Sequence, residues 1–310
     1  MLVIVNGSAN GGQGSARWQR VEEELRGRGI PFEVRPTESA EDAQRAVDDA
    51  IRAGHRELIA AGGDGTVNGV LNALMDPTTD RPRADVALGA IGLGSSNDFH
   101  KPFSPQRTIG KIPVRLSGDN APLVDVGKAI VTDRDGTVRT RYFILNGSMG
   151  LVAAGNAFFN SGDPTLLRLK RFNVELAILY TAWVNLRRFK PIAVTVKMDD
   201  QPAKELEATS LGILKKVHFA GGMRYDTPVT ADDGMFDVNI WEPMGKLATV
   251  GTMAALYRGK FTGRKRTQAH RARRVELKMA TRLDFELDGE VTQAIAADLV
   301  VLPRVLRACE

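Results

Sequence analysis

The stretch ELIAAGGDGTVNGVLNAL, residues 57–74, decides the fold predicted for this chain. Its first part is a short apolar run at 58–61, which predicts a buried strand. A glycine-rich turn of sequence GGDGT follows at 62–66, and the apolar residues after it recur at helical spacing. A strand, a glycine turn and a helix in this order can hold a phosphate, because glycine lets the backbone approach closely and N–H groups at the helix start point at the anion.

A glycine-rich turn can also be a plain turn, since most such turns bind nothing. The flanking strand and helix make GGDGT more specific than a lone glycine pattern. We therefore interpret this turn as a phosphate site whose contacts are Gly62, Gly63, Gly65 and Thr66.

The composition is that of an ordinary globular protein and favours an anionic partner. The chain has 310 residues, enough for two domains, of which 43% are apolar and 25% are charged. Its single cysteine, Cys309, excludes an internal disulfide and a multi-cysteine zinc cage. The net charge of +5 and the pI near 9.4 favour nucleotides or anionic lipid surfaces. Nucleic acid is not expected, because the sequence has neither zinc-finger spacing nor an aromatic-basic RNA-binding pattern.

The N-terminal sequence MLVIVNGSANGG predicts a strand and a loop, since its apolar run is too short for a signal peptide and lacks a basic leader. No apolar run approaches the roughly 20 residues that a membrane-spanning helix needs. We therefore expect a cytoplasmic protein that is at most peripheral to a membrane.

Strands and helices alternate in the first part of the chain. Further strands are predicted at 2–5, 32–35 and 86–91, and helices at about 17–28 and 39–53. Ser39 and Asp42 have the spacing of a capping box at the start of the second helix. The alternation predicts an α/β domain, doubly wound around a parallel sheet, over residues 1–122.

Sites in such sheets lie at the carboxyl ends of the strands. Asn6, Thr37, the GGDGT turn and Ser95 all come just after predicted strands. We therefore expect their loops to converge on one edge of the sheet.

From residue 123 onward the pattern changes to mostly alternating, strand-like segments. This predicts a β-rich antiparallel sandwich domain over residues 123–291. Two helices interrupt it, at about 166–188 and 246–257. An apolar stripe on the first helix favours core packing, with a lipid groove as the alternative. The stripe consists of Leu167, Leu169, Phe172, Leu176, Leu179, Tyr180 and Trp183.

Three motifs in chain order resemble the diacylglycerol kinase catalytic family, which includes bacterial lipid kinases and sphingosine kinases. They are GGDGT at 62–66, GLGSSNDFHK at 92–101 and Asp-Gly-Glu at 288–290. The resemblance covers nearly the whole chain. It implies a lipid kinase that uses ATP and Mg²⁺ to phosphorylate a hydroxyl of a diacylglycerol-like or sphingoid lipid. It also implies that residues 292–310 return to the first domain.

The same resemblance implies roles for individual residues. Asp64 would bind Mg²⁺ or orient the lipid hydroxyl, and Asp125 would pair with the same network. Glu290 would be the general base that takes the proton of that hydroxyl. The nucleotide contacts would be the GGDGT turn together with Asn6, Thr37, Ser95 and Asn97.

A second metal site is implied within GMRYDTPVTADDGMFDV at 222–238. Thr230, Asp233 and Met235 match positions where bacterial lipid kinases hold a metal. Oxygen ligands of this kind suit Mg²⁺ or Ca²⁺. Such a metal would be structural or allosteric, separate from the Mg²⁺ carried by ATP. The alternative is a plain Asp-Gly hairpin turn.

Some positions depart from the pattern of the family. Gly69 stands where the family often has Glu, Gly7 where proline is usual, and Ser96 where glycine is usual. Two alternatives stay open: an NAD-kinase-like enzyme and a non-catalytic nucleotide- or lipid-binding protein. The Asn97-Asp98 pair, within a string typical of lipid kinases, argues against the first.

A basic run at 259–279 is either a solvated loop or a contact for an anionic membrane, which attracts each basic residue by about 1 kcal/mol. The expected partners are therefore ATP and a lipid substrate at a membrane surface, and a homodimer is left open. The basic residues are Lys260, Arg264, Lys265, Arg266, Arg271, Arg273 and Arg274.

Overall fold

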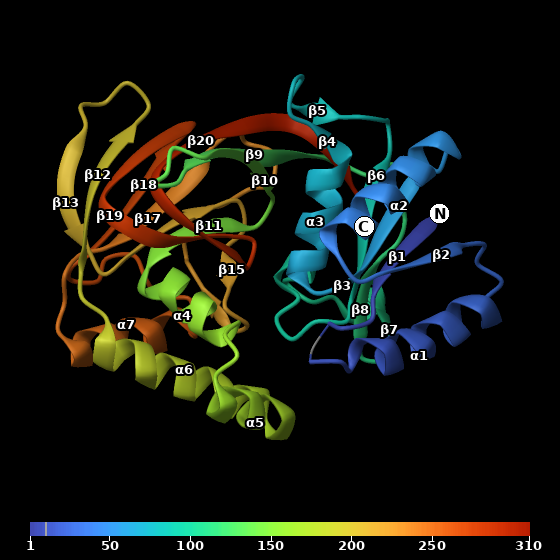
Figure 1. The fold of residues 1–310 in the computed structure, drawn as a ribbon, viewed down its shortest axis with the longest axis horizontal. Coiled ribbons are helices and arrows are strands. Elements are labelled where there is room, and N and C mark those ends of the chain that lie inside the picture. The colour runs from blue at the N-terminus through green and yellow to red at the C-terminus, as the bar shows by residue number, and fades with distance from the viewer. Residues whose placement is uncertain (10) are drawn as a thin grey trace. The chain divides into compact units, whose positions relative to one another are not determined.

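The computed structural model describes residues 1–9 and 11–310 (Figure 1). The chain divides into two compact units. Unit 1 comprises Met1–Val126 and Leu302–Glu310, and unit 2 comprises Gly127–Val301. The chain leaves unit 1 within strand β9 (Leu123–Thr132) and returns to it within strand β20 (Glu290–Ala308).

Unit 1 is built on a parallel sheet. Its strands lie in the order β2–β1–β3–β6, and each adjacent pair is parallel. The C-terminal end of β20 adds to β6 in parallel, with Arg307 paired to Ala87. The predicted α/β fold with a parallel sheet is confirmed. The four strands are β1 (Leu2–Asn6), β2 (Glu33–Thr37), β3 (Glu57–Gly62) and β6 (Ala87–Gly92).

Helices connect these strands, and their sequences explain where they begin and what they bury. Helix α1 packs Trp18, Val21 and Leu25 into the core at helical spacing. Helix α2 begins with the predicted capping box, in which Ser39 Oγ accepts the Asp42 N–H and the Asp42 carboxylate accepts the Ser39 N–H, both at 3.1 Å. The helices are α1 (Gly14–Gly27), α2 (Ala40–Arg52), α3 (Asp64–Leu74), η1 (Asp98–His100) and η2 (Pro105–Arg107). The short strands of unit 1 are β4 (Met75–Asp76), β5 (Arg81–Pro82), β7 (Thr108–Ile109) and β8 (Ile112–Arg115).

Unit 2 is an antiparallel, β-rich domain, as predicted. Its strands follow the order β18–β17–β14–β11–β19, and β12 pairs with both β13 and β19. One of these strands, β19, is 14 residues long and has a register shift between Lys278 and Leu283. The strands are β10 (Val138–Phe143), β11 (Asn146–Gly150), β12 (Ile192–Met198), β13 (Lys204–Ala208), β14 (Ser210–Leu214), β15 (His218–Phe219), β16 (Met223–Arg224), β17 (Phe236–Trp241), β18 (Thr267–Ala272) and β19 (Arg274–Leu287).

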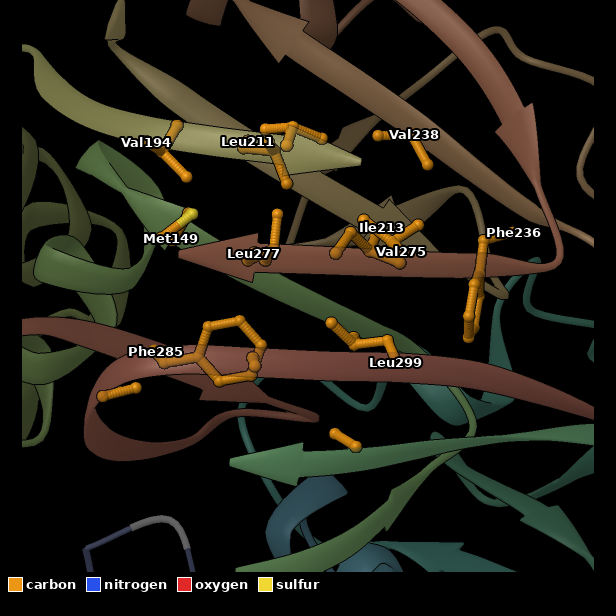
Figure 2. Packing of buried hydrophobic residues seen from close by; sticks show 14 of the residues in the cluster. Met149, Val194, Leu211, Ile213, Phe236, Val238, Val275, Leu277, Phe285 and Leu299 are labelled. Carbon is orange, nitrogen blue, oxygen red and sulfur yellow. The ribbon is translucent and has the colours of Figure 1, made fainter. Parts of the chain in front are cut away.

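The core of unit 2 is formed by side chains that meet from several of these strands. Phe143 and Phe236 stack with their ring centroids 5.6 Å apart. Gly127 allows this packing, because a Cβ at this position would collide with the Phe143 ring. Figure 2 labels further members of the same cluster: Met149, Val194, Leu211, Ile213, Val238, Val275, Leu277, Phe285 and Leu299.

The helical part of unit 2 differs from the prediction. The helix expected at 166–188 is two helices, α5 (Pro164–Phe172) and α6 (Val174–Arg188). The break occurs because Asn173 is extended and its side chain caps α6 by accepting the N–H groups of Glu175 and Leu176. Helix α4 (Leu151–Phe159) was not predicted. Helix α7 (Lys246–Leu256) agrees closely with the predicted helix.

The apolar stripe of α5 and α6 is largely outside the core, so the prediction of core packing was wrong for most of it. Helix α6 buries the smaller side chains Ala177, Thr181 and Val184 on its opposite side. The exposed set is Leu167 (43% exposed), Phe172 (83%), Leu176 (42%), Leu179 (64%) and Trp183 (54%). We name Leu176, Leu179 and Trp183 the α6 face. Within residues 1–9 and 11–310, no helix combines the length and hydropathy needed to cross a membrane.

Gly69 provides a test of helix α3. It lies inside the helix, and a Cβ there would meet open space. Glycine inside a helix costs roughly 0.5–1 kcal/mol relative to alanine. We therefore predict that Gly69→Ala raises the free energy of unfolding by about this amount, measured by chemical denaturation. Gly62→Ala is the control and should lower stability, because its Cβ would collide with the Thr66 side chain. If Gly69→Ala were no more stable than the parent protein, a Cβ at residue 69 would not meet open space.

Candidate functional site

The carboxyl ends of the parallel strands in unit 1 bring predicted nucleotide residues together. Asn6 ends β1, Thr37 ends β2 and Gly62 ends β3. The Asn6 amide donates a hydrogen bond to Thr66 Oγ1 at 3.2 Å. The Thr37 side chain is buried, and its hydroxyl donates to the Val5 carbonyl at 3.3 Å. Thr37 thus connects β2 to β1, while Asn6 contacts the GGDGT turn directly.

Two glycine turns pack directly on each other: the β3 turn (62–66) and the β6 turn (92–97). The carbonyl of Gly62 accepts the N–H of Gly94 at 3.2 Å. A Cβ on Gly94 would lie 2.5 Å from the Cα of Gly63, so this contact requires glycine. The β3 and β6 turns begin 30 residues apart in the sequence. Glycine in both turns allows their main chains to come into direct contact.

The Asp64 carboxylate links the β3 turn to the residues that directly follow the β6 turn. It begins helix α3, and its two oxygens accept the backbone N–H groups of Asp98 and Phe99, each at 3.0 Å. Burial and the nearby Asp98 charge raise the pKa of Asp64, and the two backbone hydrogen bonds oppose this rise. Asp64 therefore fixes the start of the short helix η1 against the GGDGT turn.

Asp98 is held by its own neighbours. Its Oδ1 accepts from Lys101 Nζ at 2.7 Å, and both side chains are 8% exposed. Its Oδ2 accepts from Ser96 Oγ at 2.5 Å. Ser96, the residue that departs from the family's glycine, thus adds a hydrogen bond to this carboxylate. A buried ion pair with additional hydrogen bonds is strongly sensitive to loss of either partner.

Asn97 closes the β6 turn in a left-handed conformation, with φ 51°. Its amide nitrogen donates to the carbonyls of Gly94 at 3.0 Å and Gly92 at 3.3 Å. Its Oδ1 atom is buried and has no hydrogen-bond partner among residues 1–9 and 11–310. A buried acceptor without a partner is costly, so this atom marks a place where a ligand donor would be favourable.

Arg17 is a site residue that sequence reasoning missed. From helix α1, its guanidinium donates to the carbonyls of Leu93 and Gly94, each at 2.9 Å, and to that of Gly92 at 3.1 Å. It therefore holds the first residues of the β6 turn, whereas Asp64 binds the residues that follow the turn. One feature of the sequence could have indicated this role. A basic residue in the first turn of a helix is unfavourable to the helix dipole, so its presence there suggests a specific contact.

These turns fit the phosphates of a nucleotide. The β3 turn leads into the N-terminus of α3, where backbone N–H groups favour an anion. Gly65 and Thr66 are partly exposed, and Ser95 at the tip of the β6 turn is exposed. The glycines leave room for close approach, and hydroxyl groups of Thr66 and Ser95 are at the same two turns. Asp64 lies at the β3 turn, and a carboxylate there could hold a divalent cation.

In unit 2, the predicted Asp-Gly-Glu motif forms a tight hairpin between β19 and β20. Asp288 and Gly289 are the turn residues, with φ 49° and 90°, and Leu287 pairs with Glu290. The buried Asp288 carboxylate accepts the backbone N–H groups of residues 144–146 at 2.9, 2.9 and 3.1 Å. Glu290 is exposed beside this rigid turn. The motif therefore combines a structural aspartate with an accessible carboxylate.

Glu286 is a second carboxylate at this turn that sequence reasoning missed. It is 1% exposed, and its oxygens accept from the Ser148 hydroxyl at 2.6 Å and from the Gly289 N–H at 2.5 Å. Its place in an alternating strand gave no signal, because alternation does not distinguish a buried carboxylate from an exposed one. Asp125, by contrast, accepts the backbone N–H of Arg304 at 2.9 Å within unit 1.

The structure brings the predicted metal residues Thr230, Asp233 and Met235 together around a lysine. Lys215 Nζ donates to the Thr230 carbonyl at 3.1 Å, to Asp233 Oδ1 at 3.3 Å and to the Met235 carbonyl at 2.8 Å. Asp233 also pairs with Arg271. Among the described residues, no group of three or more His, Cys, Asp or Glu side chains could hold a metal ion.

Comparison with known protein families gives two matches. The model of the diacylglycerol kinase catalytic domain matches residues 1–129. The model of the YegS C-terminal NAD kinase beta sandwich-like domain matches residues 163–310.

Comparison with individual proteins also finds similarity to lipid kinases. A Pseudomonas fluorescens protein named "Probable lipid kinase YegS-like" is 30% identical over 292 residues, which are 92% of this chain and 87% of that protein. A diacylglycerol kinase of Staphylococcus haemolyticus is 27% identical over 277 residues, which are 88% of this chain and 76% of that protein. The crystal structure of a diacylglycerol kinase from Bacillus anthracis has the same fold, with a TM-score of 0.64 and 20% identity, and covers 99% of this chain and 95% of that one.

Arg17 gives the prediction specific to this site. Arg17→Ala removes the guanidinium from three carbonyls of the β6 turn, two of which keep the Asn97 amide as a donor. We therefore expect the free energy of unfolding to fall by about 1–3 kcal/mol. Affinity for ATP, measured by calorimetry, should fall in the same variant because the turn loses its support. Arg20→Ala, on the exposed part of the same helix, is the control and should change neither quantity. Unchanged stability of Arg17→Ala would show that the guanidinium does not hold the turn.

Proposed function

The chain belongs to the diacylglycerol kinase catalytic family, and we propose that it is an ATP-dependent lipid kinase whose substrate is a hydroxyl of a diacylglycerol-like or sphingoid lipid. One observation carries the nucleotide part of this proposal: the β3 and β6 turns pack together at the carboxyl ends of parallel strands, bridged by Asp64. The names of the curated relatives support a lipid alcohol as the acceptor.

We assign the ATP phosphates to the β3 and β6 turns. Backbone N–H groups at the start of α3 and the hydroxyls of Thr66 and Ser95 would bind the phosphate oxygens. Asn97 Oδ1, which is buried without a partner in the described part of the chain, would accept a donor of the nucleotide. Asn6 supports the site by its hydrogen bond to Thr66, and Thr37 by fixing the end of β2.

Mg²⁺ bound with ATP neutralises charge on the phosphates. Asp64 is our proposed protein ligand for it. Each oxygen of this carboxylate accepts one backbone N–H in the structure and keeps a second lone pair for another contact. The Asp64 carboxylate is thereby held in one orientation, so it can bind an ion without first being ordered.

Phosphoryl transfer then needs little covalent work from the protein. The oxygen of the lipid hydroxyl forms a bond to the γ-phosphorus, the bond from that phosphorus to the β,γ-bridging oxygen breaks, and ADP leaves. We propose that Glu290 accepts the proton of the hydroxyl as this oxygen attacks. Support for this role comes from the Asp288–Gly289 turn, which fixes the backbone of Glu290 while leaving its carboxylate exposed.

Access to a lipid substrate would require contact with a membrane, and we assign this contact to the α6 face. It exposes Leu176, Leu179 and Trp183 on one side of the helix. Arg187 lies over the Trp183 ring at 4.8 Å, and Lys246 of α7 reaches the Arg187 carbonyl at 3.5 Å. Exposed apolar side chains next to cations suit an anionic bilayer surface.

Transfer of labelled γ-phosphate from Mg²⁺-ATP to a lipid panel tests the reaction. We expect a labelled phospholipid with the parent protein and a fall in turnover of about 100-fold or more with Glu290→Gln. Asp64→Asn should also abolish most of the product. Glu205→Gln, at another exposed position in unit 2, is the control and should keep full activity. Labelled NAD phosphate would instead indicate an NAD-kinase-like enzyme, and ATP binding without any product would indicate a non-catalytic binding protein.

Vesicle binding tests the membrane contact. The double variant Leu179→Ser and Trp183→Ser should lose most of its sedimentation with anionic vesicles, because it removes the exposed apolar side chains. Its melting temperature should stay close to that of the parent, since both side chains are more than half exposed. Val138→Ser changes an apolar residue that is 59% exposed on β10 and is the control. Equal vesicle binding of the double variant and the parent would refute the assignment.

A further inference from the structure

We propose that the Lys215 ammonium permanently takes the place of the divalent cation that the family resemblance implies at Thr230, Asp233 and Met235. In this protein the segment 226–235 would then be held by a cation belonging to the chain itself. The inference concerns the stability of unit 2 and is independent of the proposed reaction, because it involves neither ATP nor a lipid.

The geometry around Lys215 is that of a cation site already filled. Two backbone carbonyls and one carboxylate oxygen converge on its Nζ atom, at 3.1, 2.8 and 3.3 Å. An ammonium group carries three N–H donors and no acceptor. Thr230, Asp233 and Met235 thus offer it the same oxygen types that would coordinate Mg²⁺ or Ca²⁺.

The distances around Nζ are those of an ammonium, and a metal ion would need the same oxygens closer to it. Magnesium binds oxygens at about 2.0–2.1 Å and calcium at about 2.3–2.6 Å. The three oxygens here surround the nitrogen at hydrogen-bond distances of 2.8–3.3 Å. A metal ion in this cage would have to displace the ammonium, whose side chain is only 1% exposed.

The fold places Lys215 in this position through its backbone. It follows directly after β14 (Ser210–Leu214), and its N–H donates to the Leu145 carbonyl at 2.8 Å. The strand end is therefore fixed, and the side chain runs inward to the segment before β17. Burial of a lysine is costly unless its charge is paired, and Asp233 provides that pairing.

Asp233 joins three parts of unit 2. Its Oδ1 atom accepts from Lys215 and from the Met235 N–H at 3.0 Å, and its other oxygen pairs with Arg271 of β18. Arg271 also lies near the buried Asp237 carboxylate, at 3.9 Å. The charges of two cations and two carboxylates thus cancel locally. A divalent ion added here would be repelled by the positive charges of Lys215 and Arg271.

Thermal unfolding without nucleotide tests the inference. The melting temperature of the parent should be the same in EDTA, in 10 mM MgCl₂ and in 10 mM CaCl₂ at matched ionic strength. Lys215→Met keeps much of the side-chain volume but removes the ammonium, so its melting temperature should fall by about 10 °C. Lys204→Ala, at an exposed position on β13, is the control and should melt like the parent.

Two results would overturn the inference. One is a melting temperature of the parent that falls in EDTA or rises saturably with either ion, with the response lost in Asp233→Asn. The other is a Lys215→Met variant as stable as the parent. If Lys215→Met does not fold, the loss itself agrees with an essential ammonium, and the metal series on the parent still decides whether an ion binds. Because none of these measurements involves catalysis, failure of the kinase proposal would leave their interpretation unchanged.

Discussion

The hydrogen bonds from Asp98 and Phe99 to the Asp64 carboxylate are the contact on which the proposed nucleotide site depends. They add to the main-chain contacts between the GGDGT turn and the turn after β6, such as the hydrogen bond from the Gly94 N–H to the Gly62 carbonyl. Asp64 begins a helix, and its negative charge is favourable at the positive end of the helix dipole. The Asp64 side chain thus stabilises both the start of α3 and the loop after β6. In the same position its carboxylate could contact a cation bound to phosphate.

Carboxylates also accept backbone N–H groups and fix turns in unit 2. Asp288 binds the backbone of residues 144–146 and thereby fixes the hairpin that carries Glu290. Asp233 binds Met235 N–H and two cations before β17. Charge removed from water is costly unless it is satisfied, and both carboxylates have partners that are distant in sequence: the backbone at 144–146 for Asp288, and Lys215 and Arg271 for Asp233. The motifs that predicted the site are therefore also the points where separate segments are joined.

Much of the fold follows from local patterns, whereas the supporting contacts do not. The strand–turn–helix at 57–74 and the capping box at Ser39 were predictable because their signals lie within a few residues. Arg17 and Lys215 were missed because each acts on a segment that only the tertiary fold brings near. The α6 face was misread for a related reason: helical periodicity shows which residues share a face but not whether that face points inward. Helix α4 was missed because it is short, with Gly155 and Asn156 inside it.

Hydrogen exchange measured with and without Mg²⁺-ATP tests the central claim most directly, namely that the two packed turns hold the nucleotide phosphates. The account predicts slower exchange in peptides that cover the β3 turn, the β6 turn and the start of α3, because their backbone N–H groups would bind the phosphates. The α6 helix serves as the internal reference and should be unchanged. Slower exchange confined to other segments, with both turns unaffected at saturating ATP, would contradict it.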